Sequence, residues 1–175
     1  MKLKFWALSV LLFLAVGCAA LEPIEVREKT YGKAVPVITL SFAAKQIRPG
    51  ETWMVYLNAS DPDGDMKYIV CMIDQPGVGS YSSAYTRIKE DERKELSGYI
   101  HLNTAGVNNL NFVTLTLQVQ VQDKARHFSA PVSFPLSINN RYQQEPPPKD
   151  TFKEKNLGPI MITLRTLGDG IGYLP

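Results

Sequence analysis

Histidine is scarce in this chain, which limits the catalytic chemistry that the sequence supports. The two histidines are His101, in an expected strand, and His127, in an expected turn. The sequence contains neither the His-x-x-x-His spacing of helical zinc sites nor the Gly-x-Ser-x-Gly elbow of many hydrolases. A Ser-His-Asp triad assembles in space, so spacing alone does not exclude one. These absences favour a protein that binds rather than catalyses, with a hydrolase as the weakest alternative.

An excess of charge of one sign is also missing. The 19 Lys and Arg residues exceed the 17 Asp and Glu residues by only two. Lys2 and Lys4 account for this difference, and both lie in the leader at residues 1–17. A near-neutral mature domain has no electrostatic basis for binding nucleic acid. We therefore expect no nucleic-acid partner.

Cysteine is equally rare, with only Cys18 and Cys71 present. Cys71 lies in the apolar stretch Tyr68 to Ile73, where a lone cysteine is usually a small buried hydrophobic residue. The neighbouring sequence offers no cationic, partly exposed setting that would activate its thiol. Cys71 is therefore expected to be buried and unreactive.

The apolar leader is too short to serve as a permanent membrane anchor. Phe5 to Val16 comprises about 12 residues, whereas a membrane-spanning helix needs about 20. Lys2 and Lys4 precede this stretch and Gly17-Cys18 follows it, which is the layout of a secretory signal. The leader resembles the signal peptide of bacterial lipoproteins, although Ala15 stands where that family favours Leu.

The resemblance implies that Cys18 carries a lipid. In that family the chain is cleaved before the cysteine, a diacylglycerol is attached to its sulfur, and the new amino terminus is acylated, for example with palmitate. Two or more acyl chains give stable anchoring. Ala19, which stands where Asp would hold a lipoprotein elsewhere, favours the outer membrane if the source has two membranes. The alternative is an ordinary secretory signal that is cut near Ala19 or Ala20 and discards Cys18.

Alternating hydrophobicity predicts strands along most of the mature chain. The clearest element, Asn111 to Gln122, places one row of aliphatic residues on a single face: Val113, Leu115, Leu117, Val119 and Val121. Thr52 to Ala59 alternates in the same way, and Lys67 to Ile73 is continuously apolar, as in a central strand. Phe128 to Ile138 contains two prolines, which favours an edge strand.

Together these patterns predict an all-β fold, an antiparallel immunoglobulin-like β-sandwich of about seven strands. We expect an N-terminal signal helix over residues 1–17, a tether over 18–33, the sandwich over 34–139, and a Pro-rich linker with an extended C-terminal tail over 140–175. Within that tail, Pro159 to Leu164 has the composition of one further strand.

Two short motifs support the immunoglobulin-like class through a resemblance to bacterial surface modules, which include cadherin-like and PKD-like domains. Ala59 to Asp65 contains Asp-Pro-Asp-Gly-Asp, which many such modules have after their second strand. Val119 to Asp123 precedes a loop and Ser129, as in the family, but Ala125-Arg126-His127 replaces the expected Gly and Asn. The resemblance covers about residues 35–139 and implies a binding or structural module.

Four aspartates are candidate ligands of a structural calcium ion. Asp61, Asp63 and Asp65 lie within five residues, and Asp123 joins them if the two loops lie at the same end of the sandwich. Carboxylate oxygens are hard ligands that suit calcium. The favoured interpretation is an acidic turn without metal, in which the aspartates cap backbone N–H groups, and a bound calcium ion is the alternative. No other cofactor is expected.

Tyrosines offer a different kind of site. Tyr81 and Tyr85, if exposed together, are candidates for a sugar-stacking platform, and a carbohydrate-binding module is therefore an alternative function. The favoured function is a lipid-anchored protein of the cell envelope with a non-catalytic binding or structural sandwich. Its expected partners are the membrane, through the N-terminal lipid, and an envelope protein or a polysaccharide.

Overall fold

The computed structural model describes residues 22–107 and 110–166, so the predicted signal peptide and Cys18 lie outside the described residues. Within these ranges the chain forms ten strands and two short helices. The strands are β1 Val37–Ala43, β2 Gln46–Ile47, β3 Thr52–Ser60, β4 Met66–Gln75, β5 Gly79–Ser80, β6 Ala84–Arg87, β7 Glu95–Asn103, β8 Val113–Asp123, β9 Val132–Ile138 and β10 Asn156–Pro159. The helices are α2 Ile24–Tyr31 and the 3-10 helix η1 Glu90–Glu92.

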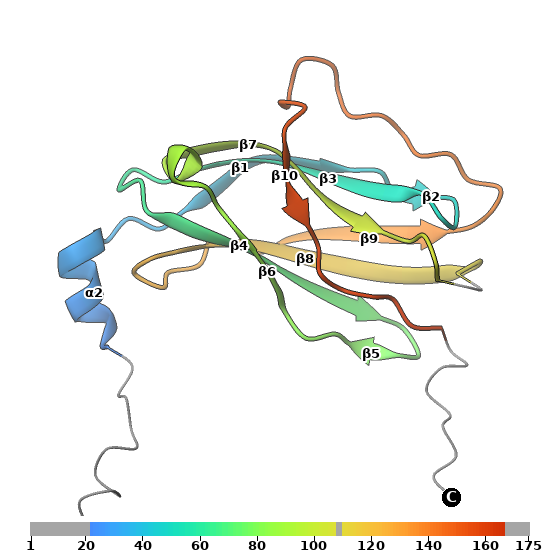
Figure 1. The fold of residues 1–175 in the computed structure, drawn as a ribbon, viewed down its shortest axis with the longest axis horizontal. Helices are drawn as coiled ribbons and strands as arrows, with labels where there is room; N and C mark the ends of the chain where they lie inside the picture. The colour runs from blue at the N-terminus through green and yellow to red at the C-terminus, as the bar shows by residue number, and fades with distance from the viewer. Residues whose placement is uncertain (1–21, 108–109, 167–175) are drawn as a thin grey trace, which may run out of the picture.

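The strands form two sheets that pack face to face (Figure 1). The first has the order β1-β3-β7-β10, and the second has the order β2-β9-β8-β4-β5, with β6 also paired to β4. β1, β3 and β7 correspond to strands A, B and E of the immunoglobulin fold. β4, β8 and β9, in the opposite sheet, correspond to strands C, F and G. The predicted all-β sandwich is confirmed.

Two short strand pairs are parallel, which the sequence patterns did not predict. β2 pairs with β9, and β10 pairs with β7, each in parallel orientation. Parallel pairing requires a long connection between the partners. Both pairs meet this condition, because most of the sandwich separates β2 from β9 in the chain, and residues 104–155 separate β10 from β7.

The core lies between the sheets and is built from the alternating residues of β3 and β8. Trp53, Val55 and Leu57 of β3 are fully buried, as are Leu117 and Val119 of β8. The intervening residues of β8 are exposed or partly exposed. The alternation predicted for both segments is confirmed, with one face of each strand turned toward the opposite sheet.

β4 is the central strand of the second sheet, as its continuous apolar run predicts. It pairs with β8 on one side and with β5 and β6 on the other. Cys71 is fully buried in this strand, and burial raises the pKa of its thiol to about 12. The expected burial of Cys71 is confirmed, and the raised pKa agrees with an unreactive thiol. β9 is paired on its outer side only at Ser137 and Ile138 among the described residues, which matches the expected edge strand.

A strap, defined as residues 143–155, crosses the outer face of the first sheet (Figure 1). The ring of Phe152 lies 5.5 Å from that of Tyr56, and the Tyr56 hydroxyl donates to the Glu154 carboxylate at 3.3 Å. Burial, together with the Glu154 charge, raises the pKa of Tyr56 to about 12. At Gly98 a Cβ atom would lie 2.4 Å from the Lys155 carbonyl oxygen, so the strap can approach β7 only over a glycine.

The chain then closes the sandwich along the side where β7 lies. β10 pairs with β7, after which Ile160 and Leu164 enter the core at 4% and 2% exposure. The predicted strand Pro159 to Leu164 is wrong in position, because the strand is Asn156–Pro159. Ile160 still donates its N–H to the His101 carbonyl of β7 at 2.7 Å. Residues 161–164 then cross toward the second sheet, where the Gln75 amide donates to the Arg165 carbonyl at 2.9 Å.

Helix α2 lies at one end of the sandwich, within the segment expected to be a tether (Figure 1). Its eight residues have no apolar face and none of them is buried. Across residues 22–107 and 110–166, no helix combines the length and apolar character that crossing a bilayer requires.

The alternation in β8 gives a direct test of the core. Leu117→Ala should lower the free energy of unfolding by roughly 2–5 kcal/mol, because it leaves a cavity between the sheets. The neighbouring control Gln118→Ala removes an outward side chain and should change this free energy by no more than about 0.5 kcal/mol. Chemical denaturation of both variants measures the two values. Equal losses would contradict the packing described for this strand.

Candidate metal centre

Three buried aspartates meet at the end of the sandwich where α2 lies. Asp61 and Asp65 belong to the turn between β3 and β4, and Asp123 ends β8. The pairing of β4 with β8 sets Met66 opposite Asp123, which brings the turn and the end of β8 together. The condition under which Asp123 joins the other aspartates, that the two loops lie at one end of the sandwich, is therefore met.

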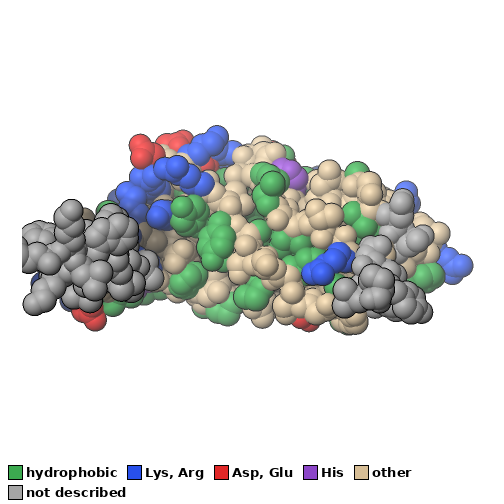
Figure 2. Space-filling view, turned by 60° about the horizontal axis from the view of Figure 1, so that its bottom comes forward, with side chains coloured by type: hydrophobic (Ala, Val, Ile, Leu, Met, Phe, Trp, Pro, Cys, Tyr) green, Lys and Arg blue, Asp and Glu red, His purple; other side chains and the backbone are tan. Residues whose placement is uncertain are grey.

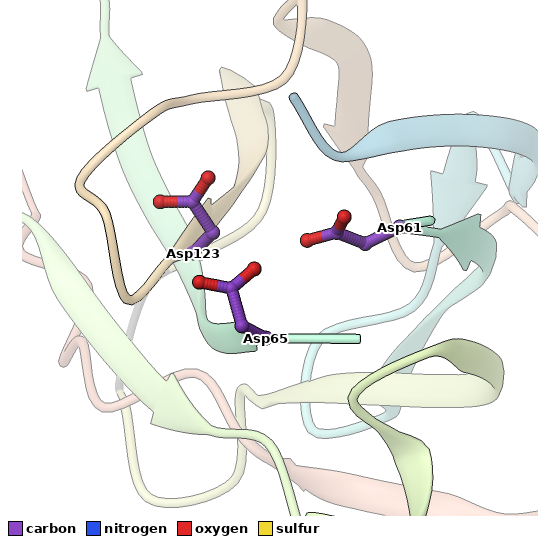
Figure 3. Close-up of side chains that lie close together, drawn as sticks. All are labelled: Asp61, Asp65 and Asp123. Atoms are coloured by element: carbon purple, nitrogen blue, oxygen red, sulfur yellow. The ribbon is translucent and has the colours of Figure 1, made fainter. Parts of the chain in front are cut away.

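The three carboxyl groups are close together and almost completely buried. One oxygen from each lies within 4.8 Å of the others, and Figure 3 shows the side chains converging from separate segments. Asp61, Asp65 and Asp123 are 1%, 5% and 1% exposed. Such burial is rare for aspartate unless the charge is paired or binds a metal.

Hydrogen bonds to the backbone fix the orientation of each carboxyl group. Asp61 Oδ1 accepts from the Asp63 N–H at 3.0 Å, and Asp65 Oδ2 accepts from the Lys124 N–H at 3.1 Å. Asp123 Oδ1 accepts from the His127 N–H at 2.7 Å. The capping predicted for an acidic turn is therefore present. Asp61 Oδ2 is buried and accepts no hydrogen bond in the described part of the chain, although the Asp61 and Asp65 carboxyl groups lie close enough to share a proton.

Burial and mutual repulsion make these carboxyl groups harder to ionise. Burial, with the adjacent Asp65 carboxyl, raises the pKa of Asp61 to about 6, although the Asp63 N–H opposes the shift. Burial also raises the pKa of Asp123, against the opposing hydrogen bonds from His127. Carboxylate oxygens arranged in this way suit a hard divalent cation such as calcium, which would neutralise the repelling charges.

Asp63, the fourth candidate ligand, is not part of this cluster. Its Oδ2 accepts a hydrogen bond from the Ala34 N–H at 2.7 Å, in the segment that follows α2. At Gly32 a Cβ atom would lie 2.0 Å from the same oxygen, so this approach requires glycine. Asp63 therefore holds the N-terminal segment, a role that its sequence position does not reveal because its partner is 29 residues away.

His127 lies beside the cluster, between two carboxylates. Its Nδ1 is 2.8 Å from Asp123 Oδ2, and its Nε2 is 3.1 Å from Glu28 Oε1. Burial lowers the pKa of His127, but the hydrogen bonds to Glu28 and Asp123 outweigh this effect and raise it. Because both ring nitrogens are engaged, the imidazole has no free position from which to activate a nucleophile.

Among the described residues, His101 forms no ion pair with a carboxylate. It borders a shallow hollow of about 240 Å³ on the outer face of the first sheet, whose lining residues are Thr52, Met54, Tyr99, His101, Asn103 and Asn156. No acidic side chain lines this hollow, so it lacks the acid or base partner that a hydrolase needs. Neither histidine thus supports the hydrolase alternative.

The two tyrosines proposed for sugar stacking do not form a platform, which corrects the prediction for Tyr81. Its ring is 9% exposed, and its hydroxyl donates to Gln75 Oε1 at 2.6 Å and accepts from the Arg165 N–H at 2.7 Å. Tyr85 is 54% exposed and packs edge-on against Tyr68. On the face shown in Figure 2, hydrophobic side chains are scattered among polar ones.

Comparison with known proteins finds a likeness in fold. No protein-family model matches the chain, and no curated protein matches it. The fold is similar to that of the PKD domain of an M14-like peptidase from a Thermoplasmatales archaeon, at 12% sequence identity and a TM-score of 0.35. The match covers 61% of this chain and 97% of the other.

Removing one carboxylate from the cluster should stabilise the metal-free protein. With a chelator at about pH 8, Asp61→Asn should raise the free energy of unfolding by roughly 1–2 kcal/mol, because it relieves repulsion between buried charges. Because the pKa of Asp61 is raised in the folded state, protonation of Asp61 adds to the free energy of unfolding. This contribution is fully present below pH about 4 and is lost as the pH rises through about 6. The gain should therefore shrink toward pH about 5.

Asp74→Asn is the matched control, because Asp74 is an exposed carboxylate on β4. It should leave the free energy of unfolding nearly unchanged at both pH values. Denaturant titrations of the parent and both variants give the comparison. A loss of stability in Asp61→Asn at about pH 8 would show that the cluster does not carry the repulsion that we derive.

Proposed function

We propose that this chain is a lipid-anchored protein of the cell envelope, whose β-sandwich has a non-catalytic binding or structural role. The observation that supports lipid anchoring is the apolar leader that ends at Cys18. Only a short segment separates this cysteine from the folded part. Cys18 precedes Glu22, the first described residue, by four positions. An acylated Cys18 would therefore hold the domain close to the membrane, in the outer membrane if the source has two membranes.

The position of α2 defines how an anchored sandwich would be oriented. α2 lies at the end where β8 finishes at Asp123, so the lipid would be attached at this end. The 11 residues of β8 extend about 35 Å to the opposite end. That end would face away from the membrane.

The outer end carries a feature suited to contact with a partner. Phe112 directly precedes β8, is 78% exposed and is held at a φ of 68°. A bulky residue in this left-handed region is strained, and such strain is retained where the surrounding structure or function requires it. We infer that this end meets an envelope protein or a polysaccharide.

Lipid attachment can be tested in cells. The full chain should label with palmitate and sediment with membranes, whereas Cys18→Ser should lose the label and appear in the soluble fraction. Cys71→Ser is the control, because its thiol is fully buried, and it should label like the parent. If the leader is an ordinary secretory signal, Cys18→Ser and the parent should both be soluble and unlabelled, which would refute the anchor.

We also propose that Asp61, Asp65 and Asp123 hold a structural calcium ion. The buried, unpartnered Asp61 Oδ2 favours this proposal over an acidic turn that is complete without metal. A bound ion would supply positive charge to the three carboxylates and so stabilise the folded state at neutral pH.

Thermal melts distinguish the aspartates that bind calcium from those that only lie nearby. Calcium at about a hundredfold excess over its dissociation constant should stabilise the parent by about 2.7 kcal/mol, which raises the melting temperature by several degrees. Asp63→Asn should retain this shift, whereas Asp61→Asn should lose most of it. The absence of a shift in the parent would leave the capped acidic turn as the explanation of the cluster.

A further inference from the structure

The attachment of α2 to the sandwich depends on polar contacts. Two guanidinium nitrogens of Arg27 donate to the Lys124 carbonyl, one of them at 2.8 Å, and Glu28 accepts from His127 at 3.1 Å. The ring of Tyr31 lies under the Lys124 ammonium at 5.6 Å. Since no residue of α2 is buried, these contacts rather than apolar packing hold the helix.

Each residue that holds α2 is itself held by a carboxylate of the cluster. Lys124 donates its N–H to both Oδ2 and the backbone carbonyl of Asp65, each at 3.1 Å, and its own carbonyl accepts from Arg27. His127 contacts Asp123 through Nδ1 and Glu28 through Nε2. Lys124 therefore connects Asp65 to α2, and His127 connects Asp123 to α2.

The N-terminal segment and the cluster also bridge the same two loops. The cluster joins the β3–β4 turn, through Asp61 and Asp65, to the β8–β9 loop, through Asp123. The N-terminal segment contacts the β8–β9 loop through α2 and the β3–β4 turn through the Ala34 N–H on Asp63. The aspartate cluster and the docked N-terminal segment both require the two loops to lie at the separation seen here. Forming either bridge therefore stabilises the other.

α2 is short enough to exist in two states. Isolated helices of fewer than about 12 residues are marginal in water, and α2 has eight. Released from its contacts, the segment would lose its helical hydrogen bonds as well. Docked helix and released chain are thus two arrangements whose balance the loops can shift.

We propose that cation binding at Asp61, Asp65 and Asp123 controls the docking of α2, and with it the orientation of the sandwich on its anchor; this rests on the proposed calcium site. When the charges are neutralised, Asp65 and Asp123 hold Lys124 and His127 in the positions that α2 requires. Without a cation, repulsion among the three carboxylates separates the two loops and releases the helix. The buried, unpartnered Asp61 Oδ2 is the independent sign that the cluster takes a ligand.

Hydrogen exchange and thermal melts of the full chain in detergent micelles test this coupling. Calcium, compared with a chelator, should slow exchange of the α2 amides by roughly fivefold or more. The double variant Arg27→Ala with Glu28→Ala removes both hydrogen-bonded links to Lys124 and His127 and leaves the contact between Tyr31 and Lys124. It should abolish most of this slowing while retaining the calcium shift in melting temperature. Glu25→Ala with Lys29→Ala makes the same change of charge at exposed positions of α2 and should behave like the parent.

The outcomes separate the coupling from the metal site. No calcium shift in the melting temperature of the parent would overturn both the site and the coupling. A clear shift without any change in exchange of α2 would overturn the coupling and leave the site intact. Equal slowing in the parent and in the Arg27/Glu28 variant would overturn the coupling through Lys124 and His127. The expected pattern across all three proteins supports it.

Discussion

Burial of one face of each sheet against the other is the constraint on which the rest of this structure depends. Because side chains alternate along a strand, a one-residue slip of β4 against β8 would turn Leu117 and Val119 out of the core. The same register that buries them sets Met66 opposite Asp123. Apolar packing thus brings the acidic turn and the end of β8 together, and it opposes the repulsion between their carboxylates.

That repulsion receives little compensation from neighbouring basic side chains. Arg27 donates to a backbone carbonyl, and the Lys124 ammonium lies over the Tyr31 ring, although both residues lie near the cluster. Among the described residues, His127 alone forms an ion pair with a member of the cluster. The sequence places cations around this end of the molecule but leaves most of the buried negative charge unpaired. The raised pKa of Asp61 is a consequence of that imbalance, and the calcium ion that we propose would be another way to neutralise it.

The sequence was sufficient for features that depend on local periodicity, and insufficient for those that depend on distant contacts. Alternation identified the inward rows of β3 and β8, and the apolar run identified β4 as central. The turn composition made Asp61, Asp63 and Asp65 candidate ligands, and Asp123 was added from the end of a separate strand. The exclusion of Asp63 from the aspartate cluster could not be predicted, because its hydrogen-bond partner Ala34 precedes the sandwich in the chain. α2 and the strap escaped prediction for the same reason: neither has an apolar stripe, and both are held by contacts with residues far away in the chain.

The closing of the sandwich by its last described residues has a consequence for the order in which the domain folds. Ile160 and Leu164 complete a core whose other members begin with Ile47. Under the export that we propose, the chain reaches the compartment where it folds with its amino terminus first, so most strands arrive before the segment that seals them. Until then, β7 exposes an unpaired edge and the core remains open on that side. The emerging protein is therefore prone to aggregation for a time, and a chaperone of that compartment that shields strand edges would protect it.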